Sequence, residues 1–487
     1  MPVIVFKLLK FIMIFFCISV LTLLAVRIYD TQRGIPLELW HTYVPNEMHA
    51  SEIDKLDWGQ YIEKENKIFD EVRLEVTQKL DKKDQVPVNR YFKGSPIYPD
   101  NFSPDWNHSY IFEPQGTPVG AVVFLHGLTD SPYSLRHIAR HYREHGFITI
   151  AIRLPAHGTV PAALTDIKWE DWLAATRLAV REAQRRIGPN KPLHLVGFSN
   201  GGALALKYAL DAIEHSELAR PNKIILISPM IGITRFARFA GFAGLPAILP
   251  AFAKAAWLSV LPEFNPFKYN SFPINGARQS YRLTMALQQE ILRFADNGLL
   301  AQLPPVLTFQ SVMDFTVSTR DIISAFYAKL PANGSELVLF DLNRAAKFGL
   351  LLRRSSGMAL ARYLNEPPRQ FRTTAITNVS VTSGQVAEHI TEAGSLEENI
   401  HPLDLFYPPD VYSLSHVALP FPVTDGLYGL QPDPNENYGI QLGATATRGE
   451  RNVLIVSLDA LIRISSNPFY PYMLKRIEEN IKSTRQT

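Results

Sequence analysis

The residues best suited to chemistry lie between 193 and 202, where the chain reads Leu-His-Leu-Val-Gly-Phe-Ser-Asn-Gly-Gly. Ser199 stands in a G-x-S-x-G pattern, after a short apolar run and before an Ala- and Leu-rich stretch. A serine hydroxyl attacks a carbonyl carbon only if it is exposed beside a base and beside free N–H donors. A sharp strand-to-helix turn supplies this geometry, and its crowded backbone requires small residues at Gly197 and Gly201. We therefore predict that Ser199 is a nucleophile, rather than part of an ordinary glycine-rich turn.

An aspartate that could assist this serine follows the predicted strand ending at Gln310. Asp314 lies at the C-terminal end of that strand, where a short loop can aim its carboxylate at a histidine Nδ1–H. Such a carboxylate fixes the tautomer of the imidazole and stabilises the imidazolium. A turn or helix-cap role is the alternative, but Asp321 fits that role better because it directly precedes an apolar helical pattern. Asp314 is therefore the predicted acid.

The base is expected to be a histidine that follows the serine and the acid along the chain. That order holds for proteins whose nucleophile stands on such a turn. Of 13 histidines, only His389, His401 and His416 lie beyond Asp314. His416 occupies a short apolar strand-to-loop passage, whereas the other two lie in charged, loop-like surroundings. We predict that His416 is the base, with a solvent-facing structural histidine as the alternative.

The oxyanion of the tetrahedral intermediate needs two N–H donors that are held in place before the charge forms. We expect one donor to be the amide of Asn200, the residue after the nucleophile. The other is expected from Leu128, because Gly127 lets the backbone approach closely in His126-Gly127-Leu128-Thr129. His126 itself comes early in the chain and is expected to be a supporting structural residue rather than the base.

Strands and helices are predicted to alternate from Ser109 onward. The expected strands are 110–112, 121–125, 147–152, the apolar run before Ser199, 223–227, 306–310 and 336–340. The expected helices are 135–145, 169–187, the stretch after Ser199 and 322–329. Such alternation predicts a mostly parallel sheet with helices on both faces.

Two insertions interrupt this alternation. The first, about 229–300, has few charges between Phe239 and Leu261, and its prolines and glycines argue against a second membrane span. It follows a sheet strand, where open α/β sheets bind ligands, so we expect an apolar cap over a site, with extra core packing as the alternative. The second, about 342–410, contains a basic helical piece at 344–354 and a β-like stretch at 373–382. We expect a structural excursion there.

The N-terminal residues 1–34 contain an apolar run, Phe11–Val26, that is preceded by two lysines. Its length is near the roughly 20 residues that a membrane helix requires. No small-residue cleavage site follows, so we expect an uncleaved signal anchor; a cleaved signal peptide and a buried core helix are the alternatives. Positive charges lie at both ends of this run, so the excess of positive charge on one side, which normally sets the orientation of a membrane helix, barely decides it here. The sole cysteine, Cys17, lies inside this run, so a cysteine-free catalytic region fits an extracytoplasmic compartment, periplasmic or extracellular.

The remaining chain is expected to form a leader and one main domain. Residues 35–108 are polar and aromatic, with one amphipathic helical stretch over Tyr61–Leu80, and we expect them to pack on the main domain, 109–487. A hydrophobic content of 46% with 20% charged residues is typical of globular proteins. A net charge of only +3 over 487 residues argues against nucleic-acid binding.

Four segments in order resemble the α/β-hydrolase superfamily: His126-Gly-Leu-Thr-Asp-Ser-Pro, Arg153-Leu-Pro-Ala-His-Gly-Thr, Trp169-Glu-Asp-Trp and Gly197-Phe-Ser-Asn-Gly-Gly. The chain looks most like the carboxylesterase, lysophospholipase and monoacylglycerol-lipase-like members, over about 115–345 and from the His416 region to the C-terminus. The resemblance implies acyl-ester hydrolysis by a serine triad, with no metal and no organic cofactor. Asn200 departs from it, because Gln, Met or His is more usual at that position.

These observations together predict a membrane-anchored serine hydrolase that cleaves lipid or other apolar acyl esters through an acyl-enzyme. Transfer of the acyl group to another acceptor, or amide cleavage, would use the same triad and remains open. A catalytically inactive hydrolase-fold binding module at the membrane is a further alternative. An intact serine, aspartate and histidine in the required order argue against it, because binding does not require all three.

Overall fold

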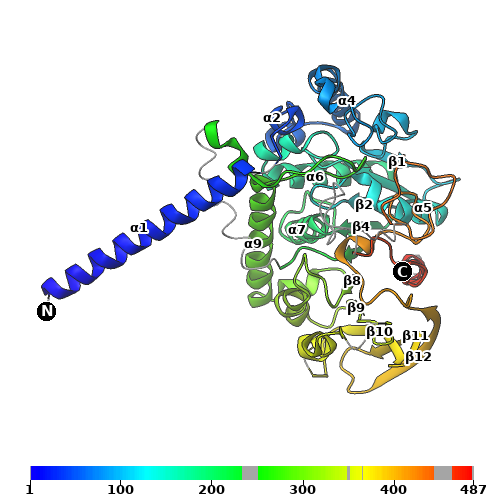
Figure 1. Cartoon of the computed structure of the whole chain (residues 1–487). Helices are drawn as coiled ribbons and strands as arrows, with labels where there is room; N and C mark the ends of the chain where they lie inside the picture. Colours follow the sequence, from blue (N-terminus) through cyan, green and yellow to red (C-terminus); the bar gives the residue numbers. More distant parts are fainter. Residues whose placement is uncertain are drawn as a thin grey trace.

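The computed structural model describes residues 2–33, 35–232, 250–347, 351–364, 366–443 and 463–484. Within these residues a large sheet lies between two layers of helices, and one long helix, α1, extends away from this body (Figure 1). The described α-helices are α1 (Pro2–Arg33), α2 (Leu39–Thr42), α3 (Ala50–Ile53), α4 (Trp58–Glu75), α5 (Arg136–Glu144), α6 (Trp169–Ile187), α7 (Asn200–Glu214), α9 (Ile274–Asp296), α10 (Thr319–Asp321), α11 (Arg354–Gly357), α12 (Ala359–Tyr363) and α14 (Tyr470–Thr484).

The main sheet has ten strands in the described residues, in the order β1-β3-β2-β4-β5-β8-β9-β10-β11-β12. From β3 to β10 neighbouring strands are parallel, while β1, β11 and β12 pair antiparallel at the two ends. The strands are β1 (Tyr110–Phe112), β2 (Gly120–Leu125), β3 (Phe147–Ile152), β4 (Leu193–Phe198), β5 (Lys223–Ile227), β8 (Val306–Ser311), β9 (Glu336–Phe340), β10 (Arg372–Ser380), β11 (Ser383–Thr391) and β12 (Glu398–Phe406). A small second sheet pairs β6 (Trp257–Ser259) with β7 (Phe272–Pro273).

The core lies on both faces of this sheet, because successive side chains of a strand point to opposite faces. On β2, Val123 packs in a cluster with α6, α7 and α9, whereas its neighbour Phe124 packs in a cluster with α5 and α14. All residues of β2, β3 and β4 are buried, as expected of parallel strands that are covered on both sides. The predicted α/β fold, with a mostly parallel sheet and helices on both faces, is thus confirmed.

The segment between α1 and β1 contacts the main sheet through a buried ion-pair network. Arg153, which directly follows β3, has a fully buried guanidinium that pairs with Glu47 at 3.0 Å and with Glu65 of α4 at 3.3 Å. The hydroxyl of Tyr61, also on α4, donates to the Arg153 carbonyl at 2.6 Å. The expected helix over Tyr61–Leu80 is wrong at both ends: α4 begins at Trp58, after the N-cap Asp57, and ends at Glu75.

The structure can be compared with the sequence predictions for parts of the two insertions, 229–300 and 342–410. Within 229–300, residues 233–249 lie outside the described residues, and with them most of the apolar stretch that suggested a cap. From Ile274 onward this segment is α9, whose apolar face packs against α7 in the core, so extra core packing describes this part. Within 342–410, β10, β11 and β12 extend the sheet. The helical piece expected over 344–354 is wrong in its described part, because residues 344–347 form turns and α11 begins at Arg354.

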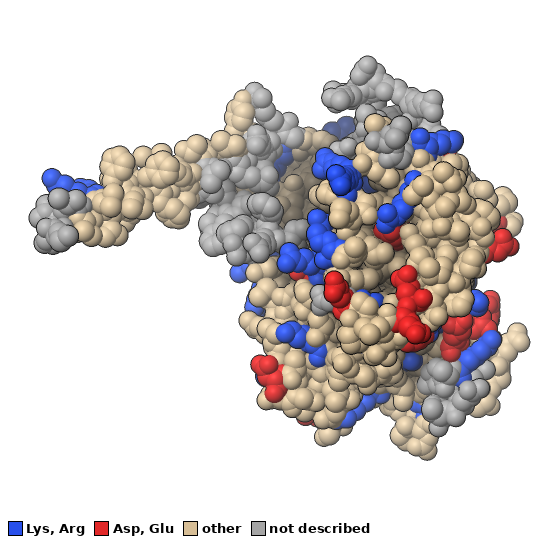
Figure 2. All heavy atoms as spheres, turned by 90° about the horizontal axis from the view of Figure 1, so that it is seen from below, with Lys and Arg blue, Asp and Glu red and all other residues tan. Residues whose placement is uncertain are grey.

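Helix α1 is the one described helix that is long and apolar enough to cross a membrane. Its segment Val5–Thr22 has no buried part, and a signal sequence would share these properties. Figure 2 shows this helix as a rod with Lys and Arg atoms near its free end and uncharged atoms along the rest of its described length. The N-terminal apolar helix that the sequence predicts is therefore present.

Candidate active site

Ser199 lies on a strained turn between β4 and α7. Its backbone has φ 54° and ψ −116°, a region that L-amino acids rarely adopt and that typically costs about 1–3 kcal/mol. Glycines on either side permit the turn: a Cβ at Gly197 would lie 2.4 Å from the Gly201 carbonyl oxygen. A Cβ at Gly201 would lie 2.0 Å from the carbonyl oxygen of Leu125, at the end of β2. The G-x-S-x-G pattern therefore has a direct steric cause.

The structure brings together the three side chains that the sequence selects. His416 Nε2 lies 3.0 Å from Ser199 Oγ, and His416 Nδ1 lies 2.8 Å from Asp314 Oδ2. The serine and the histidine are 5% and 4% exposed, so water has little access to the hydrogen bonds between them. A serine, a histidine and a carboxylate at these distances can act as a nucleophile, a base and the group that orients the base.

Asp314 is held as a carboxylate by its loop. Its Oδ1 accepts the backbone N–H groups of Thr316 at 2.8 Å and Val317 at 3.0 Å, which leaves Oδ2 to face His416. Burial opposes ionisation of this carboxyl, but His416 and the two N–H donors outweigh it, so the pKa of Asp314 lies below its ordinary value. The group is therefore ionised at neutral pH and directs the Nδ1–H of His416.

His416 opens a single 3₁₀ turn, His416–Ala418, in the segment between β12 and α14. Ser311, at the end of β8, fixes this segment by donating to the Leu414 carbonyl at 2.8 Å, and Ser415 donates to the Ile464 carbonyl. The ring of His416 also stacks on Phe198, with centroids 5.2 Å apart. The two hydrogen bonds of the segment and the stacking on Phe198 together set the direction of the His416 imidazole.

The other two candidate histidines lie on the sheet extension. His389 is on β11 and is 3.1 Å from Glu398 of β12, the strand that also carries His401. The side chain of His401 is exposed. Neither histidine joins Ser199 and Asp314.

The two predicted oxyanion donors belong to segments that meet at Ser199. Asn200 is the first residue of α7, so its N–H has no carbonyl one turn earlier in the helix. Leu128 follows Gly127, where a Cβ would lie 3.3 Å from the Cβ of Ser199. Among the described residues, no backbone carbonyl accepts the Leu128 N–H. Both amides are thus available to an oxygen bound beside the serine.

His126 has both ring nitrogens engaged. Its Nε2 accepts the Leu154 N–H at 3.0 Å, and its Nδ1 lies 2.9 Å from the Gly127 carbonyl, to which it donates. Burial lowers its pKa well below the ordinary value, with the nearby His157 as a second cause, so the ring is neutral. His126 therefore supports the backbone of the loop that carries Leu128 and is not available as a base.

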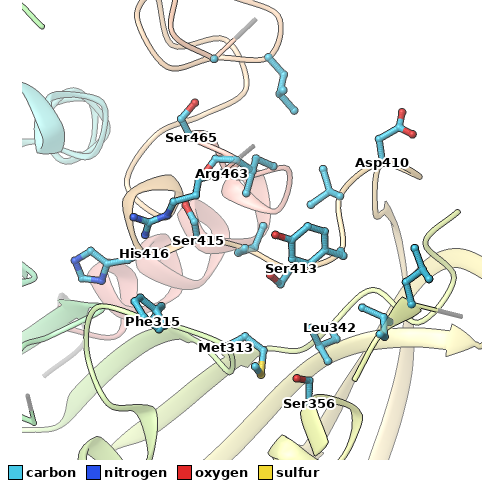
Figure 3. Close-up of a pocket in the computed structure, with 18 of the residues that line it drawn as sticks. Met313, Phe315, Leu342, Ser356, Asp410, Ser413, Ser415, His416, Arg463 and Ser465 are labelled. Atoms are coloured by element: carbon cyan, nitrogen blue, oxygen red, sulfur yellow. The ribbon is translucent and has the colours of Figure 1, made fainter. Parts of the chain in front are cut away.

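A cavity of about 810 Å³ opens beside His416, which forms part of its wall (Figure 3). Aliphatic and aromatic side chains predominate among its lining residues, including Met313, Phe315, Leu342, Leu351, Leu430 and Ile464. Arg463 and Arg353 add positive charge to the lining, and Asp410 adds a negative charge. Sequence reasoning missed this lining. Met313 and Phe315 could have been suspected as neighbours of Asp314, whereas no local pattern marks Arg463.

Several known proteins are similar to parts of this chain. A thermostable monoacylglycerol lipase from Bacillus sp. (strain H-257) is 31% identical over 98 residues, which are 20% of this chain and 38% of that protein. The chain thus matches well under half the length of that relative. A soluble variant of monoglyceride lipase from Saccharomyces cerevisiae, solved with a substrate analog, is 14% identical with a TM-score of 0.38, covering 47% of this chain and 81% of that one. A highly thermostable carboxyl esterase from Bacillus coagulans, solved with glycerol, is 15% identical with a TM-score of 0.35, covering 47% and 83%.

The family itself follows from a longer match. The sequence pattern of the Alpha/beta hydrolase family matches residues 122–369, which is more than half of the 487-residue chain. The matched region includes the turn at Ser199 and the acid Asp314, and it ends before His416. The resemblance recognised in the sequence is confirmed: this chain belongs to the Alpha/beta hydrolase family.

Proposed function

We propose that this protein is a serine hydrolase of carboxylic esters, with Ser199 as nucleophile, His416 as base and Asp314 as the acid. The observation that carries the proposal is the position of His416, with one ring nitrogen 3.0 Å from Ser199 Oγ and the other 2.8 Å from Asp314 Oδ2. The monoacylglycerol lipase and carboxyl esterase among the similar proteins support ester hydrolysis as the reaction.

In the first half-reaction, His416 Nε2 takes the proton of Ser199 as Oγ attacks the acyl carbonyl carbon. The amides of Asn200 and Leu128 donate hydrogen bonds to the oxyanion of the tetrahedral intermediate. His416 then gives its proton to the alcohol oxygen as the C–O bond breaks, which leaves an ester on Ser199. A water molecule attacks this acyl-enzyme with His416 again as base, and the acid product leaves.

The cavity and α1 support an apolar ester as the substrate. The mostly apolar lining beside His416 suits an acyl chain or another apolar part of an ester. We assign α1 as an uncleaved membrane anchor, because none of its apolar segment is buried in the protein. Such an anchor holds the active site next to a bilayer, where lipid esters are concentrated. We further propose that the catalytic domain lies outside the cytoplasm, in keeping with a chain whose sole cysteine, Cys17, lies within α1.

The chain length of the preferred acyl group tests the substrate class. We would compare kcat/KM for p-nitrophenyl esters with acyl chains of two to sixteen carbons, using the full chain in detergent and Ser199→Ala as the blank. The proposal expects the long-chain esters to be preferred. A clear preference for the acetyl ester would overturn the apolar substrate class while leaving the ester hydrolase intact. No Ser199-dependent turnover of any ester would overturn the hydrolase itself.

A further inference from the structure

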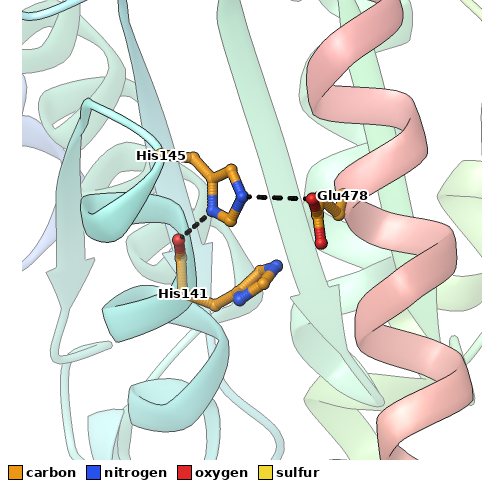
Figure 4. A group of neighbouring side chains, drawn as sticks. All are labelled: His141, His145 and Glu478. Atoms are coloured by element: carbon orange, nitrogen blue, oxygen red, sulfur yellow. Dashed lines mark hydrogen bonds and ion pairs between the residues drawn. The ribbon is translucent and has the colours of Figure 1, made fainter.

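Three metal-ligating side chains come together on the face of the sheet that α5 and α14 cover. His141 lies on α5, His145 is the C-cap residue of the same helix, and Glu478 lies on α14. One ligand atom from each lies within 4.8 Å of the other two. Figure 4 shows both imidazoles beside Glu478, in the space between the two helices. None of the three takes part in the proposed ester chemistry.

The spacing of the two histidines suits a shared ligand. Residues four apart on a helix lie on the same side, one turn apart. The ring centroids of His141 and His145 are accordingly 4.5 Å apart. Two histidines at this spacing on one helix, with a carboxylate from a second element, form a known ligand set for zinc, which accepts three protein ligands and a water.

His145 is held in the tautomer that binds a metal. Its Nδ1 lies 2.8 Å from the His141 carbonyl, and a carbonyl only accepts, so Nδ1 carries the hydrogen. In the neutral ring, Nε2 then bears a lone pair, and it lies 3.5 Å from Glu478 Oε1. A lone pair and a carboxylate repel each other unless a proton or a cation lies between them. A backbone carbonyl on the second ring nitrogen is also the usual support for a histidine that ligates a metal.

His141 adds a buried nitrogen that no described group of the protein satisfies. Its Nε2 is inaccessible to solvent and has no hydrogen-bond partner in the described part of the chain. Unsatisfied buried polar atoms are rare and require an explanation. Burial, and then the neighbouring His145, lower the pKa of His141.

Lys482 is the competing cation. Its Nζ lies 2.5 Å from Glu478 Oε1, one turn along α14. The side chain of Lys482 is 64% exposed, and such surface pairs typically contribute no more than about 1 kcal/mol. A divalent ion that also contacts two imidazoles would displace it.

A second His-Asp-Glu group nearby differs, because a buried cation of the protein already pairs with its carboxylates. His137, Asp425 and Glu436 are equally close together, but the guanidinium of Arg136 already lies 2.8 Å from Asp425 and 2.6 Å from Glu436. The guanidinium of Arg136 thus balances the negative charge of Asp425 and Glu436. At the group on α5 and α14, the cation paired with Glu478 is Lys482, whose side chain is 64% exposed.

We propose that His141, His145 and Glu478 bind a divalent transition-metal ion, Zn²⁺ in the first instance, which clamps α14 onto α5. Metal–ligand distances of about 2.0–2.2 Å would draw the three side chains inward from their present spacing. The ion would stabilise the docking of α14, whose Met473, Ile477 and Ile481 complete the core on this face of the sheet. Its role is structural, because no ester chemistry occurs there.

The test measures metal binding and metal-induced stability, neither of which depends on ester hydrolysis. The full chain, without a histidine tag, is freed of metal with a chelator and titrated with Zn²⁺ by calorimetry, and its Tm is recorded with and without the ion. We expect about one Zn²⁺ per chain with a Kd of 1 μM or tighter, a rise in Tm on binding, and no comparable effect of Mg²⁺, which prefers oxygen ligands.

Two variants and one control complete the test. Glu478→Gln keeps the shape of the side chain, His141→Ala removes the unpaired nitrogen, and His401→Ala removes an exposed histidine elsewhere. Each of the first two should weaken Zn²⁺ binding at least tenfold and abolish the metal-induced rise in Tm, whereas His401→Ala should behave as the wild type. The metal-induced shift is measured for each folded variant against its own metal-free form. Zn²⁺ binding weaker than about 100 μM by the wild type, or undiminished in both variants, would overturn the proposal.

Discussion

His416 and Asp314 lie 102 residues apart in the chain, yet their Nδ1 and Oδ2 atoms are 2.8 Å apart. The intervening sequence includes β9 and the sheet extension β10–β12, and the chain then returns to the carboxyl end of β8. The contact is therefore set by the sheet, which places the loop after β8 and the loop after β12 against β4.

Replacing Asp314 with asparagine should disable His416 without disturbing the fold. The amide cannot accept the Nδ1–H as a carboxylate does, so we expect kcat to fall by about 10⁴-fold. Ester hydrolysis and near-ultraviolet circular dichroism together check this. An Asp314→Asn variant with more than a tenth of the wild-type kcat would contradict the assigned role.

The same carboxylate makes stability depend on pH. Its pKa in the folded chain lies below the ordinary value of 3.8, so its contribution to stability is fully present above about pH 4 and is lost as pH falls through the lower folded value. The difference in unfolding free energy between wild type and Asp314→Asn should therefore shrink below pH 4. Denaturant unfolding at pH 7 and at pH 3 measures it; a difference that grows on acidification would contradict the pKa direction.

The strain at Ser199 predicts that the nucleophile lowers stability. Ser199→Gly removes the positive-φ penalty, because glycine adopts that region readily, and should raise the unfolding free energy by about 1–3 kcal/mol. Ser199→Ala keeps a Cβ and should leave stability nearly unchanged. Both should be inactive. Equal stabilities of the two variants would show that the turn is not strained.

Two glycine-to-alanine changes should have opposite effects. At Gly201 the new Cβ would lie 2.0 Å from the Leu125 carbonyl oxygen, a buried backbone atom, so we expect a loss of about 3 kcal/mol or more. At Gly276, within α9, the nearest atom would be 3.6 Å away, and alanine should stabilise the helix by up to about 1 kcal/mol. Urea unfolding of both variants measures the pair. A Gly201→Ala protein as stable as Gly276→Ala would contradict the packing described for the turn.

Narrowing the cavity should select against long acyl chains. Leu430 lines the cavity and is 37% exposed, so tryptophan can replace it without refilling the core. We expect Leu430→Trp to lower kcat/KM for a sixteen-carbon ester by about tenfold and to change that for the acetyl ester much less. Val381→Trp, at an exposed position on the turn between β10 and β11, is the control. An equal fall in kcat/KM for both esters would show that the cavity does not bind the acyl chain.

The sheet could be predicted because its strands are marked by local apolar runs. Ser199, Asp314 and His416 could be proposed because local patterns and their order along the chain indicate them. The strand ranges 147–152 and 193–198 are continuous apolar runs, which buried parallel strands require, and they match β3 and β4. The end of a predicted strand then indicated Asp314, and chain order with an apolar surrounding sequence indicated His416, because only three histidines follow Asp314. These predictions needed no knowledge of distant contacts.

What could not be predicted depends on distant contacts or on weak local patterns. Strand β12 reads as an exposed polar segment and is recognisable only from its pairing with β11. The helix expected over 344–354 had a suitable composition, yet the described residues 344–347 form turns. Glu478 meets His141 and His145 only because α14 returns to α5, and nothing in the sequence near Glu478 indicates that contact.

The central claim, that Ser199 is a nucleophile activated by His416, is tested most directly by covalent labelling with a fluorophosphonate. The full chain is treated with the reagent, and the site of the adduct is mapped by peptide mass spectrometry in the wild type, Ser199→Ala and His416→Ala. We expect a single adduct on Ser199, none in Ser199→Ala, and labelling slowed by at least about 10³-fold in His416→Ala. A wild-type protein that is not labelled, or an adduct on another serine that persists in Ser199→Ala, would contradict it.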